Sequence, residues 1–546
     1  MDTQADLFLR LEQLNVIGAA LSHERNIERL LENILEAAKS ITRADGGTLY
    51  RKTEDGRELR FEIVRTDSLG IRMGGTSGTP VNFPNLPLVN ERGEPNNAMV
   101  AVYAAIHDET VNIVDAYEEA GFDFSGTRKF DAHTGYRSKS FLTVPMKNHE
   151  NEIIGVLQLL NARDPATGEV VPFSQADQSL AESLASQAAV ALTNRILISQ
   201  LENLFESFIN LINLAIDEKS PYTGGHCQRV PELTMLIAEA VNATASGPLA
   251  DFHMTDKDRY ELKIAGLLHD CGKVTTPVHV VDKATKLQTI FDRVHLIDTR
   301  FEVAKRDAEI EALRRMLELR ECKDEAAEAN IRASLKAQIW KLDDDSEFVR
   351  RANTGGEFMS EADQQRIRDI GHLRRWRNPA GVECDFLSAD EIENLTIRAG
   401  TLTQQEREII NHHIVATIKM LERLPWPRHL THVPEYAGGH HERMDGKGYP
   451  KGLTRDQMSV QARIMGIADI FEALTARDRP YKPGMKLSQA MDIMGKFAAG
   501  GHIDPDLFEV FVREKVYLKY AEKFLDPRQR DGVDESKALA YRVAVG

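Results

Sequence analysis

Residues 440–450 read His-His-Glu-Arg-Met-Asp-Gly-Lys-Gly-Tyr-Pro, and this stretch carries more chemistry than any other part of the chain. Two adjacent imidazoles are followed by a carboxylate and by a Gly-rich turn that lets the backbone approach a ligand closely. Upstream lies the pair His269-Asp270, with Lys273 three residues on, and downstream lies Asp469. Histidine and carboxylate ligands without cysteine suit iron, manganese or zinc. Several such ligands spread over mostly helical sequence indicate a metal-assisted hydrolase.

Two further histidine positions are candidate metal ligands of the same kind. His226 follows a turn-like Tyr-Thr-Gly-Gly segment, and His412-His413 lies inside the apolar pattern of residues 408–414. A buried imidazole or carboxylate is costly unless something satisfies it. For any one of these residues a hydrogen-bonded core position explains the pattern, whereas the whole set predicts shared metal coordination.

The adjacency of His269 and Asp270 has a geometric interpretation. One helical turn can present the imidazole to one cation while the carboxylate reaches a second, about 3.5–4 Å away, as in two-metal phosphoesterases. We therefore expect Asp270 to bridge two ions that together activate a water molecule. Lys273 would hold a phosphoryl oxygen or the leaving group, with an ordinary surface lysine as the alternative. The remaining ligands are expected to divide into two groups: His226, His269 and Asp469 in one, and His412, His440 and His441 in the other.

These segments resemble the HD-GYP phosphodiesterases of bacterial cyclic di-GMP signalling. Residues 269–273 match the family's HDxGK, residues 440–450 match HHExxDGxGYP at every fixed position, and Asp469 with residues 473–475 and 479–482 matches the stretch that follows. The resemblance implies hydrolysis of cyclic di-GMP to the linear dinucleotide pGpG, or further to GMP. It implies two divalent metals, iron or manganese, with ligands at His226, His269, Asp270, His412, His440, His441 and Asp469, and dinucleotide contacts from Lys273, Tyr449, Arg479 and Lys482.

The chain departs from this family pattern at three places. His412-His413 replaces the usual His-Pro; we assign His412 as the ligand by spacing and keep His413 as the alternative. Ala416 replaces a glycine. Some relatives hold a third metal through a glutamate near the first histidine, and here Asp217 and Glu218 are nearby without a clear match, so a third ion stays open.

Residues 1–190 alternate helical and strand patterns, which predicts an α+β domain with helices flanking an antiparallel sheet. The segment 130–136, Phe-Asp-Ala-His-Thr-Gly-Tyr, followed by strand patterns at 140–146 and 153–161, resembles a GAF sensor domain, and among these it is most similar to domains that bind cyclic nucleotides. The alternative is that the aromatic residues belong to the core and that Thr134-Gly135 forms a turn. The resemblance points to a small-molecule ligand near Phe130, Asp131, Thr134 and Tyr136.

A linker and an insertion complete the organisation. Leu197, Leu201, Leu204, Phe208, Leu211 and Ala215 recur at alternating spacings of four and three, which predicts a coiled-coil helix over residues 191–218 and a homodimer. Packing of this stripe on the chain itself is the alternative. The metal-binding, all-α HD-GYP domain would comprise residues 219–282 and 401–546, divided by a charged, mostly helical insertion at residues 283–400. Within it, residues 299–343 favour one or two long helices, and the later part has a looser pattern with loop signals at 354–356 and 378–381.

The length, net charge, cysteine spacing and hydropathy of the chain exclude several classes of protein. With 546 residues the chain is too long for one core, and its formal net charge of −16 argues against binding to nucleic acid. Its four cysteines form no CxxC pair, and neither a signal pattern nor an apolar run of membrane-spanning length is present. We therefore expect a cytoplasmic protein without membrane association. Two functional alternatives remain: hydrolysis of another cyclic dinucleotide such as cyclic GMP-AMP, and a non-catalytic cyclic di-GMP receptor or scaffold.

Overall fold

The computed structural model describes residues 3–90, 93–219, 225–319, 324–356, 358–378, 380–477 and 484–541, with side chains from residue 6 onward. Its chain divides into two compact units, residues 1–205 and 206–546. Within the described residues, no helix is long and apolar enough to cross a membrane.

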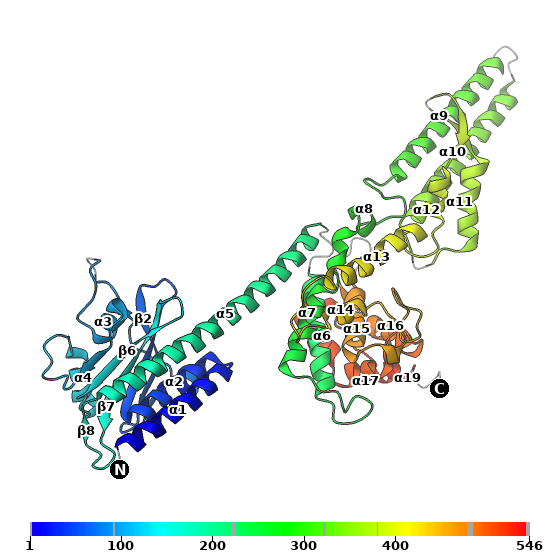
Figure 1. Ribbon diagram of the computed structural model, residues 1–546. Helices are drawn as coiled ribbons and strands as arrows, with labels where there is room; N and C mark the ends of the chain where they lie inside the picture. The colour runs from blue at the N-terminus through cyan, green and yellow to red at the C-terminus, as the bar shows by residue number, and fades with distance from the viewer. Residues whose placement is uncertain are drawn as a thin grey trace. The chain divides into compact units, whose positions relative to one another are not determined.

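The first unit is an antiparallel sheet with helices on both faces (Figure 1). The strand order is β3-β2-β1-β7-β6-β5, with β4 paired to β2 and β8 to β7. This confirms the predicted α+β domain. The elements are α1 (Thr3–His23), α2 (Ile27–Thr42), β1 (Ala44–Lys52), β2 (Glu58–Thr66), β3 (Ile71–Gly74), η1 (Gly75–Ser77), β4 (Leu86–Pro87), α3 (Val100–His107), β5 (Val111–Ile113), α4 (Ser125–Thr134), β6 (Phe141–Lys147), β7 (Ile153–Arg163), β8 (Val170–Val171) and α5 (Gln175–Lys219).

Side chains along the central strands alternate between the two faces of the sheet, so this unit has an apolar core on each face. In β1, Leu49 packs into the large cluster formed with α1, α2 and α5, whereas the next residue, Tyr50, packs into a second cluster with residues of α3. Successive side chains of a strand point to opposite faces, so both faces of the sheet are covered by helices. The predicted linker, residues 191–218, is part of the single long helix α5.

The second unit is helical. Its domain part contains α6 (His226–Asn242), α7 (Asp256–Leu268), η2 (Cys271–Thr275), α8 (Val278–Val281), α13 (Gln404–Leu421), α14 (Val433–Gly438), η3 (Arg455–Gln457), α15 (Val460–Thr475), α16 (Leu487–Ala499), α17 (Pro505–Arg513), α18 (Val516–Phe524), η4 (Pro527–Gln529) and α19 (Glu535–Ala540). Capping boxes fix the starts of α7, through Thr255 and Asp258, and of α13, through Thr403 and Glu406. These caps set where α7, which leads into His269, and α13, which carries His413, begin.

The segment between α8 and α13 forms a body with its own apolar core. It consists of α9 (Val294–Leu319), α10 (Glu325–Asn353), α11 (Glu361–Leu373), the hairpin β9 (Arg375–Arg377) and β10 (Glu383–Asp385), and α12 (Ala389–Leu395). The core includes Phe301, Phe348, Ile367 and Phe386. The later part of the insertion is therefore better ordered than its loop signals suggested, since those signals mark the α10–α11 connection and the hairpin turn.

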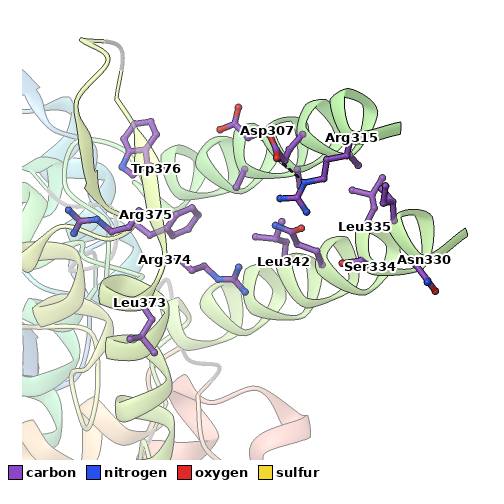
Figure 2. A pocket seen from close by; sticks show the side chains of 17 residues that line it. Asp307, Arg315, Asn330, Ser334, Leu335, Leu342, Leu373, Arg374, Arg375 and Trp376 are labelled. Carbon is purple, nitrogen blue, oxygen red and sulfur yellow. Dashed lines mark hydrogen bonds and ion pairs between the residues drawn. The ribbon is translucent and has the colours of Figure 1, made fainter. Parts of the chain in front are cut away.

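A groove of about 670 Å³ runs between α9 and α10 and reaches the hairpin (Figure 2). Small residues of α9, among them Ala304, Ala308 and Ala312, leave this space, and Leu335 and Trp376 also line it. Its three arginines have acidic partners: Arg315 contacts Glu311, while Arg374 and Arg375 contact Asp345 and Asp385.

Candidate metal centre

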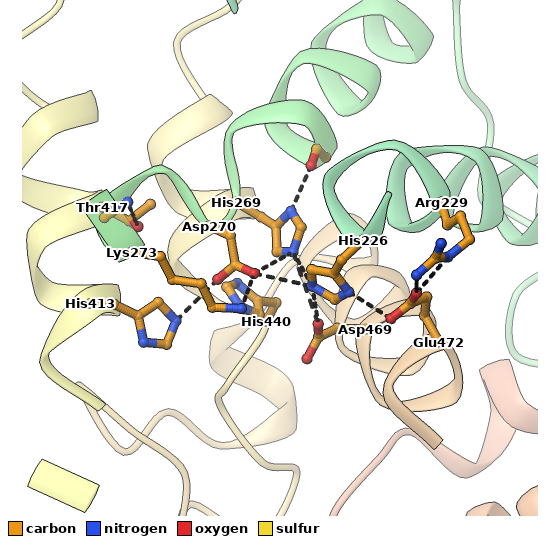
Figure 3. Close-up of polar contacts among 12 residues, drawn as sticks. His226, Arg229, His269, Asp270, Lys273, His413, Thr417, His440, Asp469 and Glu472 are labelled. Atoms are coloured by element: carbon orange, nitrogen blue, oxygen red, sulfur yellow. Dashed lines mark hydrogen bonds and ion pairs between the residues drawn. The ribbon is translucent and has the colours of Figure 1, made fainter. Parts of the chain in front are cut away.

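Six helical elements bring the candidate ligands together (Figure 3). His226 is the first residue of α6, His269 follows the end of α7, and Asp270 precedes η2. The other positions are His413 in α13, His440 and His441 after α14, and Asp469 in α15. Residues separated by more than 240 positions thus meet in one buried region.

The first group consists of His226, His269, Asp270 and Asp469, whose ligand atoms all lie within 4.8 Å of one another. The Nε2 atom of His226 is 3.1 Å from Asp270 Oδ2 and 3.3 Å from Asp469 Oδ1. His269 Nε2 is 3.3 Å from the same Asp270 oxygen. These are the residues expected to form one metal subsite, and the structure brings all four together.

The second group consists of His413, His440 and His441, again with ligand atoms within 4.8 Å of one another. His413 Nε2 is 3.2 Å from His441 Nε2 and 3.2 Å from Asp270 Oδ1. The two oxygens of Asp270 therefore face different groups, which is the arrangement expected of a bridging carboxylate.

The assignment of His412 by spacing is wrong. His412 is exposed on α13, whereas His413 is buried and faces Asp270. Adjacent helical residues point about 100° apart, so only one of them can face the site. The alternative at His413 is the position that the geometry supports.

Backbone hydrogen bonds fix the imidazole orientations in three cases. The Nδ1 atoms of His269, His413 and His440 contact the carbonyl oxygens of the residues three positions earlier, at 2.7, 2.5 and 2.6 Å. With the proton on Nδ1, the Nε2 lone pair of each ring is directed at the site. Such contacts typically select the tautomer of metal-binding histidines.

The electrostatics also favour cation binding. Burial, reinforced by His441 and His269, holds the pKa of His440 well below its ordinary value, and burial lowers the pKa of His441 to about 4. Both rings are therefore neutral, the form that binds metal. Although burial opposes it, Lys273 and His269 hold the pKa of Asp270 well below its ordinary value, and His226 does the same for Asp469. The carboxylates are thus anionic ligands.

The residues fit a pair of divalent cations. His440 Nε2 is buried without a hydrogen-bond partner, and Asp270 Oδ1 likewise has no donor beyond its contact with His413. Uncompensated buried polar atoms are rare and call for an explanation. The nitrogen and oxygen ligand set suits iron, manganese or zinc.

Glu472 and Arg229, neither of which is among the site residues predicted from the sequence, support the first group. Glu472 is almost completely buried; its Oε2 atom is 2.6 Å from His226 Nδ1, and its Oε1 accepts a hydrogen bond of 2.7 Å from Arg229. Although burial opposes it, His226 and Arg229 lower the pKa of Glu472 to about 2. Although burial opposes this shift too, Glu472 raises the pKa of His226 well above its ordinary value. The signal in the sequence was a carboxylate three residues after Asp469, on the same face of an apolar helix.

Lys273 and Tyr449 lie beside the two groups. Lys273 Nζ is 2.6 Å from Asp270 Oδ2, and the ring of Tyr449 stacks on His441 with a centroid separation of 4.9 Å. Glu442 holds the intervening loop, because its two oxygens accept the backbone N–H groups of Lys451 and Leu453. The predicted phosphate contacts Arg479 and Lys482 lie outside the described residues.

Asp217 has a buried Oδ1 atom without a hydrogen-bond partner, and burial raises its pKa, whereas Glu218 is exposed.

In the first unit, the candidate ligand-binding residues have internal partners. Asp131 accepts hydrogen bonds from Ser138 and Tyr117, and Tyr136 donates to Asp45. Thr134 donates to the carbonyl oxygen of Phe130, which is half-buried.

Comparison with known families matches a GAF domain to residues 26–192 and HD domains to residues 223–355 and 389–507. The 3'3'-cGAMP-specific phosphodiesterase 1 of Vibrio cholerae is 47% identical over 81 residues, 15% of this chain and 19% of that protein. A cyclic di-GMP phosphodiesterase of Pseudomonas aeruginosa is 36% identical over 116 residues, 21% of this chain and 27% of that protein. A cyclic di-GMP phosphodiesterase of Thermotoga maritima is 33% identical over 121 residues, 22% of this chain and 32% of that protein. Each match spans less than a third of the relative.

Among solved structures, the GAF domain of an Acinetobacter phosphoenolpyruvate-protein phosphotransferase aligns at 16% identity with a TM-score of 0.26, covering 35% of this chain and 98% of that one.

Proposed function

We propose that this chain, which carries a GAF domain followed by a divided HD domain related to the HD-GYP cyclic di-GMP phosphodiesterases, hydrolyses cyclic di-GMP to pGpG, or further to GMP. The matches to the GAF and HD domain families confirm the family relationship that the motifs predicted. The observation that carries the proposed activity is Asp270, whose two oxygens face two separate groups of histidines. A carboxylate so placed can hold two cations against one phosphodiester.

The chain's own residues have distinct tasks in this reaction. Bound divalent cations supply a water of lowered pKa and neutralise charge on the phosphoryl oxygens. Asp270, Asp469 and the five imidazoles would hold those cations in place. Lys273, one turn beyond Asp270, holds a non-bridging oxygen or supports the departing oxygen. Tyr449 stacks against the nucleotide, while Arg479 and Lys482 bind its phosphates.

Two cations per chain, iron or manganese, are the proposed cofactors. The ligands are His226, His269, Asp270 and Asp469 for one ion, and Asp270, His413, His440 and His441 for the other. A third ion remains an open part of the proposal, with Asp217 as the described carboxylate close to His226.

Purification under anaerobic conditions, metal counting and chromatography of a cyclic di-GMP digest test the proposal together. We expect two ions per chain and release of pGpG. A protein that binds cyclic di-GMP but leaves it intact while fully metallated would instead be a receptor or scaffold.

A second candidate substrate is 3'3'-cyclic GMP-AMP. The relative with 47% identity over 81 residues is specific for that dinucleotide. Parallel digests of cyclic di-GMP and cyclic GMP-AMP decide between them through the ratio of their kcat/KM values.

The proposed assembly is a homodimer through residues 191–218. Leu197, Leu201, Leu204, Phe208 and Leu211 are between 44% and 65% exposed, which leaves the predicted heptad stripe available to a second copy. Replacing Leu201 and Leu204 by aspartate should give a monomer in analytical ultracentrifugation, whereas a wild-type monomer would contradict the dimer.

The GAF domain is proposed to bind a small ligand, a cyclic nucleotide being the first to test. Thermal shift measurements with cyclic GMP and cyclic AMP should show stabilisation by one of them. Absence of a shift with either would exclude this ligand class.

A further inference from the structure

The insertion is attached to the metal-binding domain through a buried lysine. Lys283, which is only 1% exposed, directs its ammonium at three acceptors: Asn394 Oδ1 at 2.8 Å and the two oxygens of Glu406 at 2.8 and 2.7 Å. Asn394 belongs to α12 of the insertion, and Glu406 belongs to α13 of the domain. An ammonium has three donors, so Lys283 is fully used in joining these helices.

Glu406 is shared between this contact and the start of α13. Its side chain accepts the backbone N–H of Thr403 at 2.8 Å, and its own N–H donates to Thr403 Oγ1 at 3.2 Å, which completes the capping box. The carboxylate that starts α13 is therefore the same carboxylate that Lys283 holds.

A second buried lysine ties the insertion's two ends together, and among the described residues its ammonium has hydrogen bonds to Met359, Leu395 and Ile397 and none to α13. Lys286 Nζ donates to the carbonyl oxygens of Leu395 and Ile397 at 3.1 and 2.8 Å, at the end of α12. In addition, Thr401 Oγ1 donates to the carbonyl oxygen of Lys283 at 2.9 Å. We call the contacts of Lys283, Lys286, Asn394 and Glu406 the root of the insertion.

The root is two helical turns away from the metal centre along α13. Glu406 and His413 are seven residues apart, hence on the same helix face and about 10 Å apart along the axis. At the other end of this span, Gly272 N donates to Thr417 Oγ1 at 2.9 Å, and a Cβ atom on Gly272 would come within 2.0 Å of the His413 carbonyl oxygen. The helix is thus held once by the root and once by η2, with His413 between them.

We propose that Lys283 is a positioning residue for the second metal subsite, because the root of the insertion sets the placement of α13 and hence of His413 relative to Asp270, His440 and His441. The inference rests on the proposed binding of two metals. It gives the insertion a direct connection to the subsite of His413 through α13.

Metal titration of the full-length protein tests this inference. The wild type should bind two Mn²⁺ per chain, with an exchange-coupled pair visible by electron paramagnetic resonance. Lys283→Met should keep one site intact and weaken the other about 10- to 100-fold, the usual effect of losing a residue that orients a metal ligand. The spectrum at one equivalent should then be that of isolated Mn²⁺. His413→Ala provides the reference for a chain that has lost the second subsite.

Lys286→Met is the matched control, since it removes a buried lysine of the same root whose hydrogen bonds go to Met359, Leu395 and Ile397 rather than to Glu406. This variant should retain two sites and the coupled signal. Lys283→Arg should restore part of the second-site affinity. If Lys283→Met unfolds, Glu406→Gln serves instead: glutamine also completes a capping box, so this variant isolates loss of the lysine pair, and it should weaken the same site.

Two coupled Mn²⁺ ions at wild-type affinity in Lys283→Met, or in Glu406→Gln when that variant must be used, would overturn the inference while leaving the proposed function intact. Equal weakening in Lys286→Met would also overturn it, by showing a general effect of the root's stability. A wild-type protein that binds no metal would overturn the proposed function itself.

Discussion

Asp270 Oδ1 lies 3.2 Å from His413 Nε2, and this contact joins the end of α7 to the middle of α13. The other oxygen of the same carboxylate is 3.1 Å from His226 Nε2. A single side chain therefore belongs to both groups of candidate ligands.

Replacing Asp270 with alanine should remove both of the proposed metals and reduce the proposed phosphodiesterase activity by at least about a thousandfold, since metal catalysis contributes several kcal/mol of transition-state stabilisation. The helical content should be retained, because Asp270 precedes η2 and lies outside the long helices. Metal analysis, turnover and circular dichroism measure the three quantities. Two bound ions in this variant would contradict the bridging role.

Alanine substitutions of the adjacent residues His412 and His413 test which of the two binds metal. His413→Ala should lower the metal content from two ions to one, whereas His412→Ala should keep both, because only His413 faces Asp270. The reverse result would restore the assignment made from spacing.

Glu472→Gln should weaken the ion held by His226 about 10- to 100-fold, as is usual when the partner of a metal-binding histidine is lost. The glutamine cannot provide the negative charge that Glu472 presents to His226 Nδ1 and Arg229. Competition with a metal indicator measures the affinity, and the exposed Glu514→Gln is the control. Unchanged affinity would limit Glu472 to a purely structural role.

The stability of the metal-free protein should fall as the pH is lowered from 6.5 to 4. Burial lowers the pKa of His441 to about 4 in the folded state, whereas the unfolded chain titrates near 6.5. In this window the unfolded state binds a proton that the folded state does not, so the free energy of unfolding decreases, by up to about 3 kcal/mol. His226, whose pKa is raised by Glu472 against the effect of burial, stabilises the fold fully below pH 6.5 and adds no slope there.

Urea unfolding in the presence of a chelator at several pH values measures this dependence. His441→Gln removes one of two such rings and should reduce the slope, while His440, whose pKa burial also lowers, supplies the slope that is left. A wild-type profile without slope between pH 6.5 and 4 would show that the ring is not held neutral.

Gly272→Ala should destabilise the second unit by at least about 2 kcal/mol, because overpacking of a tight contact typically costs 1–3 kcal/mol and the clash here involves backbone. The added methyl group would lie 2.0 Å from the His413 carbonyl oxygen. Gly532→Ala, where nothing lies within 4 Å, is the control. Chemical denaturation of both variants provides the comparison, and equal stabilities would show that α13 yields at this point.

The sequence alone determined the types of ligand, their order along the chain and the two domain classes. It could do so because short motifs such as residues 269–273 and 440–450 contain both the helix periodicity and the side chains that bind metal. It could not choose between His412 and His413, since either fits the spacing and only the rotation of α13 against η2 decides which ring is buried. It showed Glu472 only as a carboxylate on the same helix face as Asp469, and it did not indicate that Glu472 and Lys283 contact residues far away in the chain. Such pairings join residues 246 and 123 positions apart, and they form only when the elements that carry these residues pack together.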